Sequence, residues 1–169
     1  MSERFHEIFL QVNGEVVYER VDARTTLVDF VRDTLHLTGS HVGCEHGVCG
    51  ACTMRVDGGI VRGCLMLAVQ CDGAWVETIE YISDTGYIAD LQEAFQARNA
   101  LQCGFCTPGM LITAHEFLLD AQESLNKRDI PSREAIRKHL SGNYCRCTGY
   151  HAIVDAVEAV ARKRAGMSE

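Results

Sequence analysis

The sequence has no extended basic run and no long apolar run. Its 16 Lys and Arg are outnumbered by 23 Asp and Glu, which gives a formal net charge of −7. A chain of this charge lacks the basic surface that binds nucleic acid or an anionic membrane. No apolar stretch approaches the roughly 20 residues that a transmembrane helix needs. We therefore expect neither a nucleic-acid partner nor a membrane span.

Export signals, internal repeats and low-complexity segments are also missing. The first residues, MSERFH, contain neither a charged region followed by an apolar one nor a twin-arginine pair. We therefore expect a cytoplasmic protein, in a reducing compartment where thiols stay free. With 169 residues, 47% of them hydrophobic, the chain can form one large or two small domains with packed cores.

Cysteine, in contrast, is abundant. There are nine cysteines, and eight of them fall into two sets of four. The first set lies in GCEHGVCGAC (43–52), with the spacing C-x4-C-x2-C, and is completed by Cys64. This spacing is typical of a loop around a plant-type [2Fe–2S] cluster. Gly43, Gly47 and Gly50 would let backbone N–H groups approach the sulfur atoms. The expected ligands are Cys44, Cys49, Cys52 and Cys64.

The second set consists of Cys103 and Cys106, in LQCGFC, and of Cys145 and Cys147, in YCRC. Both pairs fall in predicted turns between helices, and antiparallel packing can bring the two turns to one end of a bundle. A metal cluster there would tie two helical hairpins together. The spacing leaves open whether this cluster is [2Fe–2S] or [4Fe–4S]. Cys71 lies outside both sets and is expected to be a small buried hydrophobic residue.

Other cysteine chemistries fit the pattern less well. An odd number does not suit a disulfide framework, and a chain of this length can form a core without one. Each C-x2-C pair matches half of a zinc site, and His46 is near the first, but C-x4-C-x2-C and Cys145-x-Cys147 are poor zinc spacings. No cysteine stands alone with a helper histidine, as a catalytic thiol would. The cysteine–histidine pairing of a Rieske centre is absent.

Over the first 80 residues the pattern is that of short strands. Two β-prone runs, 5–12 and 15–21, are joined by Asn13-Gly14, which predicts a hairpin. A helix is expected over 25–39, with a threonine cap and Gly39 at its end. The apolar run 65–69 is expected in the core. Further strands are predicted at 53–56, 60–64 and 75–79.

From about residue 80 the hydrophobic period changes from 2 to 3.6, which indicates helices. Helices are expected around 88–97, from Thr107-Pro108, from Pro131-Ser132 to Gly142, and around 153–160, with a polar connection at 122–130. We therefore predict an α+β protein. A small mixed sheet packs on one helix over residues 1–80, and a four-helix bundle occupies residues 81–169.

Three motifs give the chain a resemblance to a known family. With GCEHGVCGAC (43–52) and Cys64, LQCGFCTPGM (101–110) and GNYCRCTGYHAIVDAV (142–157), it resembles the small iron–sulfur subunit of xanthine-oxidase-family molybdenum hydroxylases. The resemblance covers nearly the whole chain and includes all eight cysteines in order. It implies a plant-ferredoxin-like (β-grasp) domain over 1–80, a helical [2Fe–2S]-binding domain over 81–169, and two separate [2Fe–2S] clusters.

The resemblance also implies partners and a role in an oxidoreductase. A large subunit would bind substrate and carry molybdopterin, in bacteria commonly as the cytosine dinucleotide. A medium subunit would carry FAD, in a dimer of heterotrimers. Electrons would pass from the molybdopterin site through the helical-domain cluster and the ferredoxin-like cluster to FAD. By this resemblance Gln102 and Cys147 contact the pterin, whereas without it Gln102 would be interpreted as capping a helix end.

Two other functions stay open on the sequence. The first 80 residues alone would suffice for a free-standing ferredoxin, and the second cysteine set argues against it. A zinc-stabilised interaction module would have no redox role and would be colourless, whereas an iron–sulfur protein is red-brown. A carrier would also elute alone on gel filtration, whereas a subunit would elute in a larger assembly.

Overall fold

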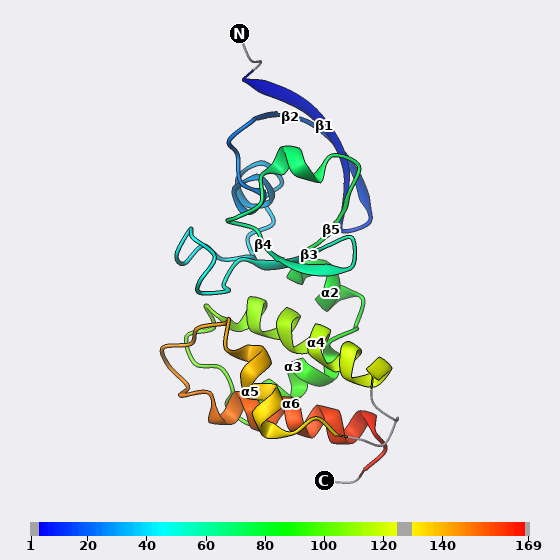
Figure 1. Cartoon of the computed structure of the whole chain (residues 1–169), viewed down its shortest axis with the longest axis vertical. Helices are drawn as coiled ribbons and strands as arrows, with labels where there is room; N and C mark the ends of the chain where they lie inside the picture. The colour runs from blue at the N-terminus through cyan, green and yellow to red at the C-terminus, as the bar shows by residue number, and fades with distance from the viewer. Residues whose placement is uncertain (1–3, 125–129, 168–169) are drawn as a thin grey trace.

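The structure, a computed structural model, describes residues 4–124 and 130–167. An N-terminal half built on a β-sheet and a C-terminal half built of helices follow one another along the long axis of the molecule (Figure 1). This arrangement confirms a mixed α/β chain with the sheet first. The polar connection expected at 122–130 falls largely outside the described residues.

The sheet has five strands in the order β2-β1-β5-β3-β4. The hairpin predicted at Asn13-Gly14 is present, and a second one forms at Asp57-Gly58, because each pair places two consecutive residues at positive φ, as a tight two-residue turn requires. In the middle of the sheet, β5 runs parallel to β1 and antiparallel to β3. The strand bounds are β1 (Phe5–Val12), β2 (Glu15–Asp22), β3 (Thr53–Val56), β4 (Gly59–Arg62) and β5 (Trp75–Glu77).

The helix expected over 25–39 is shorter than predicted. It begins as α1 (Leu27–Asp29), where Thr26 Oγ1 accepts a hydrogen bond from the Asp29 amide at 3.2 Å, and continues as a π-helical turn over Phe30–Thr34. His36, at a φ of 59°, then turns the chain out of the helix. The apolar run 65–69 is also only partly in the core, since Leu65 is 64% exposed.

The helical half contains the four predicted helices and one more. The additional helix, α2, is short and directly follows the sheet. In this half α3 packs on α4 and α6, and α5 packs on α4 and α6. This half is therefore helical, and among the described residues α2 is an element that the sequence did not predict. The bounds are α2 (Ile79–Asp84), α3 (Ala89–Ala97), α4 (Thr107–Ser124), α5 (Arg133–Leu140) and α6 (His151–Arg164).

Each half has its own hydrophobic core. The first core takes its buried residues from positions 8 to 76, and it includes Cys71, which is fully buried as expected. The second takes them from positions 79 to 161. Helix α4 lies against β3 and β4 and so forms much of the contact between the halves (Figure 1). Within the described residues, no helix is long and apolar enough to cross a membrane.

Candidate metal centres

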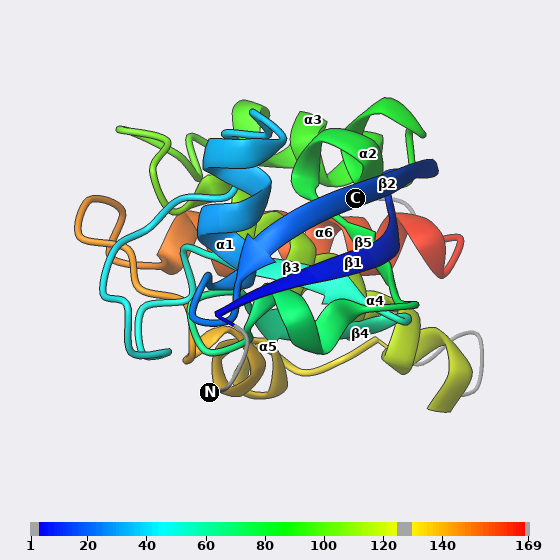
Figure 2. The same cartoon turned by 90° about the horizontal axis from the view of Figure 1, so that it is seen from above.

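Three segments that carry seven of the eight predicted ligands lie on one side of the molecule, and the eighth ligand, Cys64, lies shortly after the end of β4. In both views the loop at 40–52, the turn after α3 and the turn before α6 project to the same side (Figures 1 and 2). The loop at 40–52 comes from the sheet half, and the two turns come from the helical half. The fold thus brings the two cysteine sets close to each other without mixing them.

In the first set the thiols touch in two pairs. The Cys49 amide points at Cys44 Sγ, at 3.4 Å, and the two thiols are within hydrogen-bonding reach. Cys52 and Cys64 form the second pair. Gly47 and Gly50 have positive φ, as predicted, but Gly43 does not. A Cβ at Gly43 would lie 3.0 Å from Cys49 Sγ, so the need for glycine there is one of space.

The second set repeats this arrangement with partners from distant parts of the chain. Cys103 Sγ lies 3.5 Å from Cys147 Sγ, and Cys106 is within hydrogen-bonding reach of Cys145. Thr148 donates to Cys145 Sγ with both its amide, at 3.4 Å, and its hydroxyl, at 3.1 Å. Cys52 and Cys64 of the first set are buried, whereas Cys103 and Cys147 are exposed.

The pairwise contacts of the thiols favour one of the metal chemistries that the spacing left open. Across residues 4–124 and 130–167, no three His, Cys, Asp or Glu side chains gather where they could hold a single metal ion. A structural zinc ion needs four ligands around one point. A two-iron cluster instead takes two thiolates on each iron, and a cubane cluster takes one thiolate on each of four irons. The donor set of each site therefore fits [2Fe–2S].

The protein environment affects the thiols unequally. Burial, with a smaller contribution from the paired thiols Cys52 and Cys145, raises the pKa of the Cys64 thiol to about 11 and that of Cys106 to about 12. In contrast, the hydrogen bond from the Cys49 amide lowers the pKa of Cys44 to about 6. Buried thiols hold their protons at neutral pH, so metal binding at both sites must release protons.

Gln102 and Cys147, predicted together as pterin contacts, lie together in the structure. The Gln102 amide Nε2 donates to the Cys147 carbonyl at 3.2 Å, and both residues are exposed. The exposed aromatic side chains of Phe105 and Tyr144 come from the same two turns. The second cysteine site therefore opens onto an exposed surface that carries both polar and aromatic groups.

Two histidines, His46 and His115, have contrasting surroundings. Glu45 and His46 are exposed on the first loop, where His46 Nδ1 donates to the Cys44 carbonyl. His115 is 5% exposed and stacks with Tyr87, with 6.4 Å between the ring centres. Burial, with smaller contributions from the cations Arg164 and Arg55, lowers the pKa of His115 to about 4. It is a neutral packing residue of α4.

The two sites are joined by contacts that the sequence did not predict. The Tyr144 amide donates to the Cys49 carbonyl at 2.8 Å. His41 Nδ1 donates to the Phe105 carbonyl at 2.7 Å, and its ring stacks on Phe105 at 4.6 Å. The buried side chain of Asn143 lies between the halves. In the sequence these residues stand out only because they are close to cysteines. That position does not reveal which distant residue each of them contacts.

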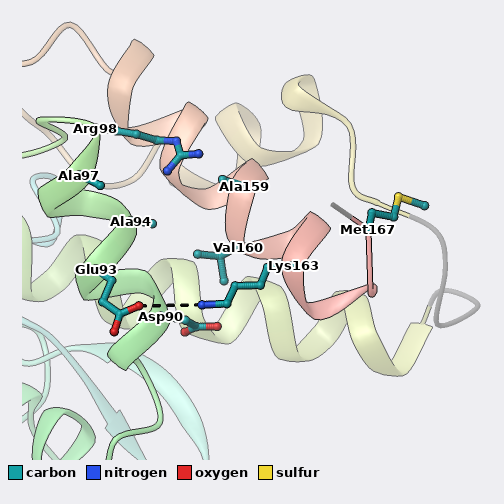
Figure 3. A pocket seen from close by; sticks show the side chains of 9 residues that line it. All are labelled: Asp90, Glu93, Ala94, Ala97, Arg98, Ala159, Val160, Lys163 and Met167. Carbon is teal, nitrogen blue, oxygen red and sulfur yellow. Dashed lines mark ion pairs between the residues drawn. The ribbon is translucent and has the colours of Figure 1, made fainter. Parts of the chain in front are cut away.

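A surface groove of about 470 Å³ lies between α3 and α6 (Figure 3). Small apolar side chains form its floor, and Lys163 Nζ lies 3.9 Å from Glu93 Oε2 at its side. None of the lining residues is a cysteine. The groove is therefore separate from the metal centres.

Two family models match the chain, one on each cysteine set. The "2Fe-2S iron-sulfur cluster binding domain" matches residues 10–74, and the "[2Fe-2S] binding domain" matches residues 78–158. Two curated relatives match over nearly their whole length. The gamma subunit of caffeine dehydrogenase from Pseudomonas sp. is 51% identical over 92% of this chain and 90% of that protein. The small subunit of nicotine 6-hydroxylase from Paenarthrobacter nicotinovorans is 53% identical over 89% and 87%.

Solved structures agree with these matches. A chain of quinoline 2-oxidoreductase from Pseudomonas putida 86 is 43% identical, with a TM-score of 0.84 over 96% of this chain and 97% of that one. Aldehyde oxidoreductase from Desulfovibrio gigas is 40% identical, with a TM-score of 0.79 over 95% of this chain but only 17% of that one. In the second protein the matching region is therefore a small part of a much longer chain.

Proposed function

The chain belongs to the small iron–sulfur subunits of xanthine-oxidase-family molybdenum hydroxylases, and on this premise we propose that its eight paired cysteines hold two [2Fe–2S] clusters. The first cluster is assigned to Cys44, Cys49, Cys52 and Cys64. The second is assigned to Cys103, Cys106, Cys145 and Cys147. The observation that supports this assignment most directly is the contact of the thiols in two pairs at each site.

The chain is an electron-transfer subunit of an oxidoreductase complex. When bound, [2Fe–2S] clusters accept and release one electron at a time. Backbone amides and the Thr148 hydroxyl donate to cysteine sulfur at both sites, and such bonds tune the reduction potential. The substrate-binding site belongs to the large molybdenum subunit of the family, so this chain contributes no catalytic residue.

We place the large subunit on the exposed surface at Cys103 and Cys147. Cys147 would be both an iron ligand and a neighbour of the pterin. Because Gln102 Nε2 already donates to the Cys147 carbonyl, the amide oxygen is left to accept from a pterin N–H group. The first site, on the sheet half, would then face the FAD-binding medium subunit. This order gives the route from molybdopterin through the second and then the first cluster to FAD.

Four finer assignments belong to the same proposal. The pterin is the cytosine dinucleotide form, and the assembly is a dimer of heterotrimers. The location is the cytoplasm, where free thiols can take up iron. The chain divides into a ferredoxin-like (β-grasp) domain over 1–80 and a helical domain over 81–169. Two separate hydrophobic cores, the second of which begins at Ile79, support a boundary at this place.

A free-standing ferredoxin is the alternative that this account replaces. The relatives reported above are subunits or regions of larger enzymes, by their names and lengths. An exposed second site also suits a permanent partner, because thiolate ligands at the surface are open to oxidation when nothing covers them.

Paired substitutions test the ligand assignment. In the anaerobically purified chain, Cys49→Ser should remove the first cluster and Cys106→Ser the second, so each variant should hold about two irons instead of about four. Cys71→Ala is the matched control, since Cys71 is buried and unpaired with another thiol, and it should keep both clusters. If Cys49→Ser and Cys106→Ser lost the same electron paramagnetic resonance (EPR) signal, the division into two sites would be wrong.

A further inference from the structure

We propose that Asn143 is a positioning residue that sets the separation of the two cysteine sites, and with it the rate of electron transfer between them. The proposal rests on the two clusters assigned above. Asn143 lies in the turn between α5 and α6, two residues before Cys145. It is 1% exposed, although asparagine is usually a surface residue.

The amide of Asn143 is hydrogen-bonded at both ends. Its Nδ2 donates to the Gly50 carbonyl, at 3.2 Å, on the loop of the first set. Its Oδ1 lies 3.0 Å from Thr113 Oγ1 on α4 and 3.4 Å from Arg62 Nη2 on β4. The Thr113 hydroxyl also lies 2.8 Å from the Gly109 carbonyl, so one proton serves both acceptors. A single buried side chain therefore holds the first loop, the sheet and the helical half together.

This side-chain bond stands next to a backbone bond. Tyr144 follows Asn143 and donates to the carbonyl of Cys49, and Gly50 follows Cys49. Two consecutive residues before Cys145 thus bind two consecutive carbonyls of the first loop, and Cys49 and Cys145 are proposed ligands of different clusters. Two adjacent bonds fix both distance and orientation, whereas one bond would allow rotation.

Close backbone approach shows how tightly this junction is packed. A Cβ on Gly50 would lie 2.5 Å from the Gly142 carbonyl oxygen and 2.7 Å from Asn143 Nδ2. Arg62 also links the two halves at this junction, because its guanidinium donates to the Gly142 carbonyl at 2.9 Å and to Thr53 Oγ1. The loop of the first set and the turn of the second set therefore meet so closely at Gly50 that even one added methyl group would overlap the Gly142 carbonyl and the Asn143 side chain.

Electron transfer between two fixed centres depends steeply on their separation. Misplacing reacting groups by about 1 Å can cost up to about 100-fold in rate, even when the substitution is remote from the chemistry. Loss of the Asn143 bonds would free the Tyr144–Cys49 contact to open. The expected result is slower transfer between clusters that are themselves intact.

Asn143→Ala and Thr113→Val test the proposal in the iron-loaded full chain. Thr113→Val keeps the shape of the side chain and removes only the hydroxyl that meets Asn143. Both variants should keep about four irons per chain and both cluster signals. Both should show weaker magnetic coupling between the reduced clusters in the EPR spectrum than the wild-type chain shows. Transfer between clusters after pulsed one-electron reduction should slow by about tenfold or more.

A structural readout that needs no electron transfer accompanies these measurements. Hydrogen exchange at the Tyr144 amide should become about tenfold faster in both variants, because its bond to Cys49 is no longer supported. Thr85→Val is the matched control, since the Thr85 hydroxyl makes the same kind of bond within its helix and touches nothing across the junction. Glu116→Gln weakens the contact between the halves away from the cysteines, at the Arg55 ion pair. Neither control should change the coupling.

The outcomes separate failure of this proposal from failure of the proposed function. If the wild-type chain holds fewer than two clusters, the ligand assignment is wrong. If the wild type shows two coupled clusters and Thr113→Val leaves the coupling, the transfer rate and the Tyr144 exchange unchanged, Asn143 does not position the sites. A loss of coupling in Glu116→Gln equal to that in Asn143→Ala would also refute the proposal, because any weakening of the interface would then suffice.

Discussion

The close approach of Gly109 to Gly50, where the two halves meet, predicts how one added methyl group changes the stability of the chain. A Cβ added to Gly109, in the first turn of α4, would lie 2.2 Å from the Gly50 carbonyl oxygen, and contacts under 3.0 Å are essentially never observed. The position of the added Cβ is fixed by the backbone of α4, and the carbonyl oxygen that it meets belongs to the backbone of the loop, so no flexible side chain can move aside. The Gly109→Ala variant must therefore push the first loop and α4 apart by most of an ångström.

Two effects of opposite sign act on this variant. Alanine is better than glycine in a helix by about 1 kcal/mol. Forcing extra atoms into a packed site costs typically about 1–3 kcal/mol, and more where backbone must shift. Because backbone must move here, we expect a net loss of about 1–2 kcal/mol, which for a chain of this size lowers the apparent melting temperature by about 2–8 °C.

The assay is thermal unfolding of the iron-loaded chain at one scan rate, followed by circular dichroism. Gly59→Ala serves as the control, since the nearest atom to a Cβ there is the Val56 carbonyl oxygen at 3.8 Å. It should leave the melting temperature unchanged or raise it slightly. A Gly109→Ala variant as stable as Gly59→Ala would refute the close packing of the two cysteine loops.

Two further predictions concern charge. Burial holds the pKa of His115 at about 4 in the folded chain, below its unfolded value of 6.5. Between these two pH values the folded chain therefore binds fewer protons than the unfolded chain. The free energy of unfolding should thus fall by up to about 3 kcal/mol as the pH drops from 6.5 towards 4. The ring and charged groups around His115 are those of Tyr87, Arg164, Arg55 and Asp90. His115→Phe should make the urea midpoint of unfolding depend less on pH over this range. An unchanged pH dependence in this variant would contradict the prediction. Arg55→Met should cost about 3 kcal/mol or more, because it leaves the buried Glu77 without its partner at 2.7 Å, whereas Arg133→Met at an exposed ion pair should cost less than about 1 kcal/mol. Equal losses in these two variants, measured by urea unfolding, would refute the difference in burial.

Local features of the fold were predictable from the sequence, because neighbouring residues determine them. Asn13-Gly14 specifies its turn whatever surrounds it, and Ser132 caps α5 by accepting from the Ala135 amide at 3.2 Å, three residues away. The short α2 was missed, because six residues carry too little periodicity to be recognised. Leu65 was assigned to the core because it is apolar, but it lies over Gly47 on the exposed cysteine loop.

Which residues gather at the candidate sites was predictable, but how they pair was not. The cysteine spacing separates the eight thiols into two sets, yet Cys103 meets Cys147 across 44 positions of sequence. Asn143 appeared to be an ordinary polar residue in a turn, and its partner Gly50 lies 93 positions away. Contacts of this range depend on the docking of the two halves, which no local pattern contains.

The most direct test of the account is the iron content and EPR spectrum of the wild-type chain, purified without oxygen and reduced with dithionite. The account predicts about four irons per chain and two distinguishable [2Fe–2S] signals of equal intensity. A folded chain that contains zinc, or one iron–sulfur signal, or no metal while bound to its partner subunits, would contradict it.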